Sequence, residues 1–229
     1  MRNKKRWGAA FALIFFLFCV SCQNSAKAAT MHLVKAEGTV GVSDEEGAAV
    51  EVRENLGLYS GYRMETETES YAWINLDQVK LTKMDAESRA EIHKNGKQLE
   101  IFLHAGSLFF HVTEPLGEDE TLEIHTSLML VGIRGTCGWV ECIDSSHARV
   151  YILEGTIECS AADESGETVS VSGGEMAELI NGEITVSPFD ESQIPLFVRE
   201  ELLEDEALQR ETDDASGPET DDTSRRETD

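Results

Sequence analysis

The chain has 229 residues, a length that fits one large domain or two small ones, and we expect a single folded body. It carries 44 acidic residues against 19 lysines and arginines, for a formal net charge of -25. Nucleic-acid binding is disfavoured in so acidic a chain, because phosphate contacts need a basic surface. Hydrophobic residues make up 41% of the sequence, enough to bury a core, which excludes global disorder.

Residues 1–21 have the pattern of a secretory signal peptide. Four basic residues lie within the first six positions, and an uncharged run of 14 residues follows from Trp7 to Val20. As a helix this run would span roughly 21 Å, less than the roughly 30 Å of a bilayer's hydrocarbon core. The sequence therefore predicts export from the cytoplasm followed by removal of this segment.

Two cleavage sites compete at the end of the predicted signal. Residues 20–22, Val-Ser-Cys, resemble the lipobox of bacterial lipoproteins, although Cys19 stands where those proteins usually have leucine. In that reading Cys22 is acylated, residues 22–30 form a tether, and the lipid anchor holds the protein at the membrane. Residues 26–28, Ala-Lys-Ala, fit ordinary signal peptidase, which would release a soluble product to the cell surface. We favour the lipoprotein because Cys22 directly follows the apolar run.

Short runs of alternating apolar and polar residues dominate positions 31–189. In one of them Ala72, Ile74 and Leu76 share a face, as in a half-buried strand. Asn95-Gly96 and Asn181-Gly182 each separate two such runs, and this dipeptide favours a type I′ hairpin between antiparallel strands. We predict an all-β domain over 31–189, an antiparallel-rich β sandwich or roll. A β-solenoid-like coil is the alternative, because the strands recur at regular intervals.

The pattern changes after residue 189. Asp190 or Ser192 can cap a helix that Pro195 enters at its first turn, and we predict a packing helix over 190–208. Its apolar positions follow helical spacing at Ile194, Phe197, Val198 and Leu202. Residues 209–229 repeat an acidic phrase with no apolar residue larger than alanine, which predicts a disordered acidic tail.

Three cysteines follow Cys22 in the chain: Cys137, Cys142 and Cys159. On one straight strand the backbones of Cys137 and Cys142 would be roughly 16 Å apart, too far for a disulfide. A bond between Cys142 and Cys159 on neighbouring strands is the remaining pairing. We favour three buried, small apolar side chains instead.

Sequence patterns of catalytic and cofactor sites are missing. Gly96-Lys97 is followed by glutamine, so the nearest candidate for a phosphate loop fails, and no nucleophile elbow occurs. The six histidines form no short zinc-binding pattern, and His104 and His111 alternate with core positions, which places them on outward faces. We predict no catalytic residue, no metal site and no cofactor, in a protein that is not an enzyme.

Residues 132–138 look superficially like a glycine-rich anion loop. An apolar run precedes them and Trp139-Val140 follows with no helix pattern, so a strand-to-turn structure fits better. There we expect Gly135 to supply a special backbone angle or a close approach, and Thr136 a turn hydrogen bond. We expect Arg134 to be a buried structural cation paired with a carboxylate.

At these residues the sequence resembles the FecR domain, an extracytoplasmic module of bacterial signal regulators and surface proteins. The central match is Thr126–Val140, with its apolar run followed by Ile-Arg-Gly-Thr and a strand. Further phrases stand in the family's order at Glu37–Gly41, Leu58–Thr66, Ser70–Leu76, Leu103–Leu108 and Val150–Ile157, so that the resemblance covers about residues 31–186. It implies structural roles for the motif residues Gly132, Arg134, Gly135, Thr136, Glu154 and Gly155.

The best-known FecR proteins carry a cytoplasmic segment that grips a sigma factor, then a membrane span, then this domain. Six residues precede the hydrophobic run here, too few for that segment. The resemblance therefore implies an exported interaction module at the bacterial cell envelope, whose partner is another envelope protein or a wall polymer. One alternative is a sensory component of envelope- or metal-responsive signalling, acting through a separate transmembrane sigma/anti-sigma regulator. Another is a wall-associated scaffold that uses exposed aromatics such as Tyr59, Tyr62 and Tyr71.

Overall fold

The computed structural model describes residues 29–77, 79–162 and 168–204, which form a β structure with one helix near the carboxyl end. The strands within these residues are β1 (Met31–Glu37), β2 (Val40–Ser43), β3 (Ala49–Val50), β4 (Leu56–Leu58), β5 (Tyr62–Thr66), β6 (Tyr71–Asp77), β7 (Lys80–Met84), β8 (Arg89–Asn95), β9 (Gln98–Val112), β10 (Thr121–His125), β11 (Met129–Ile133), β12 (Cys137–Asp144), β13 (His147–Glu154), β14 (Thr156–Ala161), β15 (Thr168–Ser172), β16 (Glu175–Ile180) and β17 (Glu183–Pro188). A 3-10 turn, η1 (Glu191–Gln193), precedes the helical residues 196–204.

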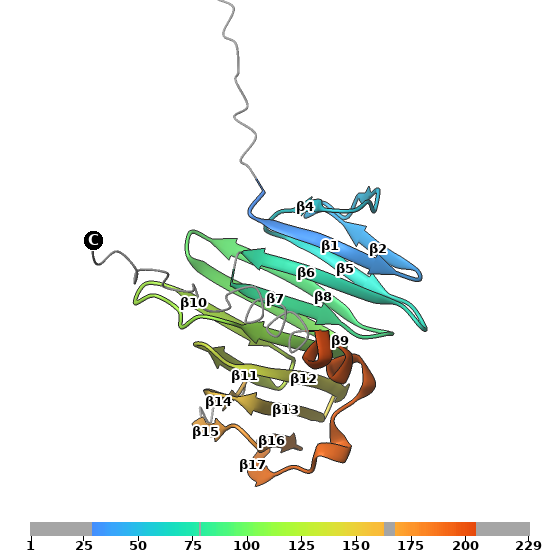
Figure 1. Ribbon diagram of the computed structural model, residues 1–229. Helices are drawn as coiled ribbons and strands as arrows, with labels where there is room; N and C mark the ends of the chain where they lie inside the picture. The colour runs from blue at the N-terminus through green and yellow to red at the C-terminus, as the bar shows by residue number, and fades with distance from the viewer. Residues whose placement is uncertain (1–28, 78, 163–167, 205–229) are drawn as a thin grey trace, which may run out of the picture.

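The strands form two facing sheets that share one long strand. Sheet A has the order β4-β1-β6-β7-β9-β12-β13-β16-β17. Sheet B has the order β3-β2-β5-β8-β9-β10-β11-β14-β15. The first half of β9 pairs within sheet B, and from Gly106 onward the strand pairs within sheet A. In Figure 1 the strands stack from the blue amino-terminal end to the orange carboxy-terminal end, because the chain moves back and forth between the sheets as it advances.

The pairing confirms the all-β, antiparallel-rich prediction. Among the described strands only β9 and β10 pair in parallel, and the two sheets do not close into a barrel. A solenoid coil stacks its strands in parallel, so antiparallel neighbours favour the sandwich. The regular strand spacing that suggested a coil comes from hairpins placed alternately in the two sheets, as with β10–β11 in sheet B and β12–β13 in sheet A.

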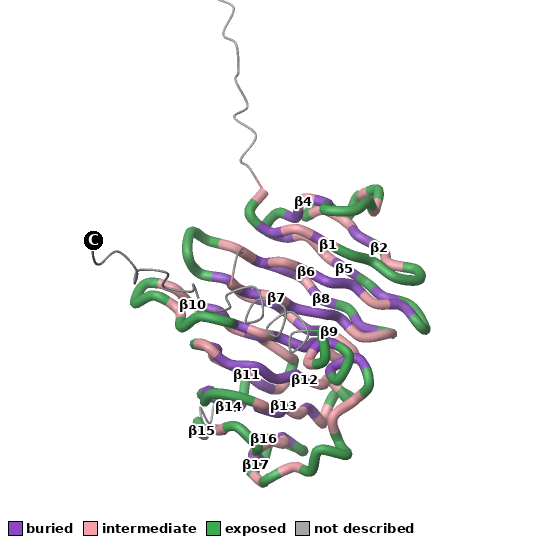
Figure 2. The backbone as a smooth tube through the Cα atoms, viewed as in Figure 1, coloured by how far each residue is buried: buried purple, intermediate pink, exposed green. Residues whose placement is uncertain are grey.

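The core lies between the sheets, where the alternating residues of each strand meet. Ala72, Ile74 and Leu76 on β6 are at most 1% exposed, as their alternation predicts. From the other sheet, Leu122 and Ile124 on β10 are buried in the same cluster. Figure 2 shows buried segments along the strands and exposed residues mainly at the loops. Burial of apolar area on this scale supplies most of the folding free energy.

The two Asn-Gly hairpins have different turns. At the β16–β17 hairpin Ile180 pairs with Glu183, and the two loop residues Asn181 and Gly182 have φ of 52° and 86°, as a type I′ turn requires. At the β8–β9 hairpin Asn95 itself pairs with Gln98, so the loop residues are Gly96 and Lys97. Only Gly96 has positive φ there, which suits a type II′ turn and corrects the predicted turn type.

The outer face of sheet A is aromatic, and the carboxy-terminal segment covers it. Trp139 and Tyr151 stack with ring centroids 4.2 Å apart, and Phe197 and Val198 of the helix pack on the same cluster. The predicted helix begins after Pro195, while Asp190 caps η1 rather than the helix, with a capping box to Gln193. Figure 1 shows the helix lying against this sheet near β9 and β12.

A buried lysine holds the helix in place. Lys83 on β7 is 1% exposed, and its Nζ lies 2.9 Å from Glu201 Oε1 and donates to the Phe197 carbonyl at 3.0 Å. Trp73 Nε1 donates to the same Glu201 oxygen at 2.8 Å, and Lys83 Nζ lies 4.6 Å from the Trp73 ring centroid. These contacts join β6 and β7 to the helix by directional bonds as well as apolar packing.

The predicted signal peptide, Cys22, the tether up to residue 28 and the acidic tail lie outside the described residues, and these assignments stay predictions. Within the described residues no helix is both long enough and apolar enough to span a bilayer.

Candidate functional site: a groove on the outer face of sheet B

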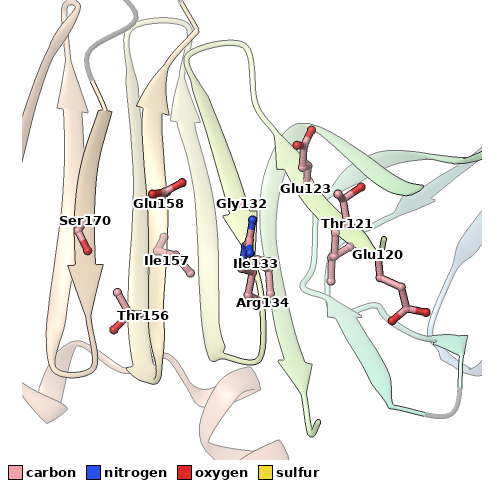
Figure 3. Close-up of a pocket in the computed structure, with 11 residues that line it drawn as sticks. Glu120, Thr121, Glu123, Gly132, Ile133, Arg134, Thr156, Ile157, Glu158 and Ser170 are labelled. Carbon is pink, nitrogen blue, oxygen red and sulfur yellow. The ribbon is translucent and has the colours of Figure 1, made fainter. Parts of the chain in front are cut away.

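An open groove of about 480 Å³ runs across β10, β11, β14 and β15 on the outer face of sheet B (Figure 3). Strand register places four of its residues in one row: Glu123 lies opposite Gly132, Gly132 opposite Glu158, and Glu158 opposite Ser170. Two strand spacings separate Glu123 from Glu158, about 9.5 Å between backbones. The two carboxylates thus form facing walls, and Gly132 forms the floor.

The floor is open because Gly132 has no side chain. Its φ is not in the left-handed region, so the backbone does not demand glycine. A Cβ at this position would come no closer than 3.7 Å to another atom, the Glu158 carbonyl oxygen, an ordinary contact. A larger residue would therefore be tolerated in the strand and would occupy the groove.

Arg134 lines this groove, which corrects its predicted role as a buried cation. The residue is exposed, and it makes no ion pair with any described residue. It follows the last residue of β11, where its carbonyl oxygen accepts from Leu116 N and its side chain faces the solvent side of sheet B. Figure 3 shows Arg134 next to Gly132, between the strands that carry Glu123 and Glu158. The apolar residues around it in the sequence point to the opposite face.

The other motif residues form the turns beside the groove. Gly135 has φ of 129°, and a Cβ there would lie 3.1 Å from Pro115 Cα. Gly155 has φ of 85°, and a Cβ there would lie 2.8 Å from the Gly135 carbonyl oxygen. Gly155 therefore lets the β13–β14 connection lie against the β11–β12 connection, and Gly135 lets the β11–β12 connection lie against Pro115, which follows β9. Glu154 is exposed, and it pairs with Cys137 in the register of β12 and β13. It is not part of the groove.

Thr136 does not form the predicted turn hydrogen bond through its side chain. The residue is 2% exposed, and its hydroxyl has no hydrogen-bond partner among the described residues. Its carbonyl oxygen instead accepts from Val112 N at 3.1 Å. Thr136 thus packs against Gly155, whose Cβ position would lie 2.5 Å from the threonine Cγ2.

Sequence reasoning found Gly132 and Arg134 but missed both walls. Glu123 and Glu158 are two of many acidic residues in the chain, and nothing local distinguishes them. Only the pairing of β11 with β10 on one side and β14 on the other brings them together. The alternation of Leu122 and Ile124 with Glu123 was the available signal, because it predicts that Glu123 faces outward.

The cysteines do not line the groove, and no disulfide joins them. Cys137 and Cys142 both lie on β12 in sheet A, whereas Cys159 lies on β14 in sheet B. Burial raises the pKa of the Cys142 thiol to about 11 and that of Cys159 to about 12. At neutral pH these thiols are protonated, which makes them poor nucleophiles.

One family model matches the chain over most of the segment that builds this groove. Residues 62–158 match the family model described as FecR protein. This stretch runs from β5 into β14 and contains both walls of the groove, its glycine floor and Arg134. No curated protein matches the chain.

Solved structures with the same fold include two of a "putative anti-sigma factor" from Parabacteroides distasonis ATCC 8503, at 1.65 and 2.50 Å resolution. Each is 15% identical to this chain with a TM-score of 0.50, and each alignment covers 57% of this chain. The alignment spans 61% of the length of that protein, and at this identity the likeness concerns the fold. The match of residues 62–158 to the FecR family model confirms over this segment the resemblance carried by the ordered sequence phrases.

Proposed function

We propose that this protein is a non-enzymatic FecR-domain interaction module that works outside the cytoplasm at the bacterial cell envelope. The observation that carries the proposal is the groove, whose floor is a glycine that the backbone does not require. Two carboxylates and one unpaired guanidinium line it within the family segment. A groove of this kind suits a protein segment that inserts a basic side chain between Glu123 and Glu158. Arg134 then faces an acidic group of the same partner.

Filling the groove is expected to abolish partner binding without unfolding the domain. In Gly132→Leu the new side chain occupies the floor, whereas strand propensity improves and its Cβ makes only an ordinary contact. The matched control is Gly41→Leu, because Gly41 also faces outward from sheet B, on β2, with no contact closer than 4.0 Å. We expect recovery of the partner to fall at least tenfold in Gly132→Leu and to stay unchanged in Gly41→Leu.

The measurement is crosslinking in living source cells, followed by affinity isolation and mass spectrometry of the bound material. A partner recovered equally with both variants would remove the groove from the proposal. Robust turnover of a defined substrate by the pure protein would contradict its non-enzymatic character.

A second candidate function is signalling through a separate transmembrane sigma/anti-sigma regulator. It is favoured by the fold shared with the P. distasonis structures, which are described as those of a putative anti-sigma factor. Recovery of such a regulator in the crosslinking experiment, together with altered sigma-dependent transcripts after gene deletion, would make this function primary. Unchanged transcripts would exclude it.

The wall-scaffold alternative has less support. Tyr59 is 40% exposed and packs edge-on against Tyr62. Tyr71, however, packs against the aromatic cluster under the carboxy-terminal helix and is only partly exposed. The three tyrosines therefore do not form one exposed binding platform. Retention of the protein on purified cell wall would restore this alternative.

We infer that Cys22 anchors the protein to a membrane, and Cys22→Ser tests this directly. Without the thiol no lipid can be attached, so the protein is expected to move from the membrane fraction to the soluble fraction. The mass of the mature amino terminus gives an independent measure. A mature chain that starts at residue 29 in both forms, with unchanged fractionation, would establish the rival cleavage site instead.

A further inference from the structure

Three side chains with metal-binding atoms meet beside the groove on the outer face of sheet B. Glu100 lies on β9, and Glu123 and His125 lie on β10. Their ligand atoms all lie within 4.8 Å of one another, although 23 positions of sequence separate the two glutamates. The parallel pairing of β9 with β10 brings them together, because it places Glu100 directly opposite Glu123.

The donor spacing fits a divalent metal ion. His125 Nε2 lies 3.2 Å from Glu123 Oε2. Ligands about 2.0–2.2 Å from a tetrahedral ion lie about 3.4 Å from each other, so this pair is already at coordination spacing. Glu100 offers a carboxylate oxygen within 4.8 Å of both of these donor atoms. All three residues are partly buried, which leaves an open side for further ligands.

The imidazole is held in a fixed orientation. Its ring stacks on Phe102, with centroids 4.6 Å apart and an interplanar angle of 24°. Phe102 lies opposite His125 in the strand register, and the edge-on ring of His93 packs on its other side at 5.3 Å. Such packing restricts the orientation of the ring and so keeps Nε2 beside the Glu123 carboxylate.

Repulsion between the carboxylates of Glu100 and Glu123 also favours binding of a cation. Like charges directly opposite each other on neighbouring strands destabilise a sheet. Among the described residues, neither Glu100 nor Glu123 forms an ion pair with a lysine or arginine. The nearby Arg63 is bound to Glu91 at 3.0 Å, with His93 on the other oxygen of that carboxylate. A bound divalent ion would neutralise a repulsion that no lysine or arginine among the described residues compensates.

We propose that Glu100, Glu123 and His125 bind a divalent transition-metal ion of the zinc class. An imidazole in the donor set favours such an ion over Mg²⁺ or Ca²⁺, which prefer oxygen ligands alone. Three protein ligands leave at least one coordination position for water or for a group of a partner, on the side of Glu123 that borders the groove. The site goes beyond the proposed function, because metal binding does not require the groove to hold a partner.

Titration of the full chain with Zn²⁺ alone, followed by calorimetry and by thermal unfolding, tests the proposal. We expect one ion per chain at this site, a higher Tm in Zn²⁺, and much weaker binding of Mg²⁺. Glu123→Gln and His125→Ala are each expected to weaken Zn²⁺ binding at least tenfold. Glu158→Gln is the matched control, because Glu158 lies on the opposite wall of the groove and outside the cluster.

The thermal unfolding of each variant without metal shows whether it is folded, so that loss of binding is not mistaken for loss of structure. Zn²⁺ binding that survives both Glu123→Gln and His125→Ala lies elsewhere, at thiols for example, and overturns the proposal. An equal effect of Glu158→Gln, or equal affinity for Mg²⁺, would mean nonspecific attraction to acidic surface and would overturn it as well.

Discussion

Glu201→Ala is expected to lower the free energy of unfolding by about 3 kcal/mol and to release the carboxy-terminal helix from sheet A. The substitution leaves the ammonium of Lys83, 1% exposed, without its nearest counter-charge at 2.9 Å. Removing one partner of a buried ion pair is costly because the other charge stays desolvated. Trp73 Nε1 loses its acceptor at the same time, and an unmet buried donor adds to the cost.

Urea denaturation followed by tryptophan fluorescence measures this effect, because Trp73 and Trp139 both lie under the carboxy-terminal segment. The matched control is Glu200→Ala. Glu200 also faces Lys83, at 3.4 Å, but its side chain is 52% exposed, so its removal is expected to cost less than about 1 kcal/mol. If Glu201→Ala and Glu200→Ala lowered the free energy of unfolding equally, the helix would be held by apolar packing and not by the buried pair.

The position of the helix illustrates what the sequence alone could predict. The spacing of Ile194, Phe197, Val198 and Leu202 indicates an amphipathic helix, and these are the residues that pack on the aromatic cluster. The surface of sheet A on which the helix packs was harder to predict. Trp139 and Tyr151 occupy outward positions of their strands, which alternation assigns to solvent, and they are buried only because a distant segment covers them. Lys83 belongs to the same surface, and no local pattern predicts a buried lysine.

The pairing of the strands was predictable only where a turn decides it. Asn181-Gly182 closes the predicted hairpin because both residues accept positive φ. Asn95-Gly96 also lies in a hairpin, but the register of β8 and β9 moves the turn by one residue to Gly96-Lys97. A shift of one residue exchanges the two faces of a strand, so the buried face of Ile92 and Leu99 overrides the turn preference of asparagine.

The groove and the metal-binding cluster depend on contacts between strands that are distant in the sequence. Apolar neighbours predict that Arg134 is buried, yet Arg134 continues the alternation of β11 and lies on the outward face, as Gly132 does. Glu100 and Glu123 meet through the parallel β9–β10 pair, which needs the long connection 113–120 and has no hairpin signal. Periodicity thus predicts which side of a strand a residue occupies, whereas the neighbour across the strand is decided by sheet order.

Gly155→Ala is expected to destabilise the domain by about 3 kcal/mol, because strain and overlap add at one position. The residue has φ of 85°, a conformation that costs an L-residue about 1–2 kcal/mol. Its new Cβ would also lie 2.8 Å from the Gly135 carbonyl oxygen and 2.5 Å from Thr136 Cγ2. The Gly135 carbonyl oxygen is a backbone atom, so it can move away from the new Cβ only if the β11–β12 connection moves. That connection carries Arg134.

Gly174→Ala separates the two causes, since Gly174 has nearly the same φ, 84°, with nothing within 4 Å of its Cβ position. Only the conformational cost applies at Gly174. We therefore expect Gly174→Ala to lower the free energy of unfolding by about 1 kcal/mol, measured by urea denaturation of the same chain. The difference of about 2 kcal/mol between the variants measures the close approach of the two connections. Equal destabilisation would mean that the connections separate freely, and then the FecR motif would not fix Arg134 at the groove.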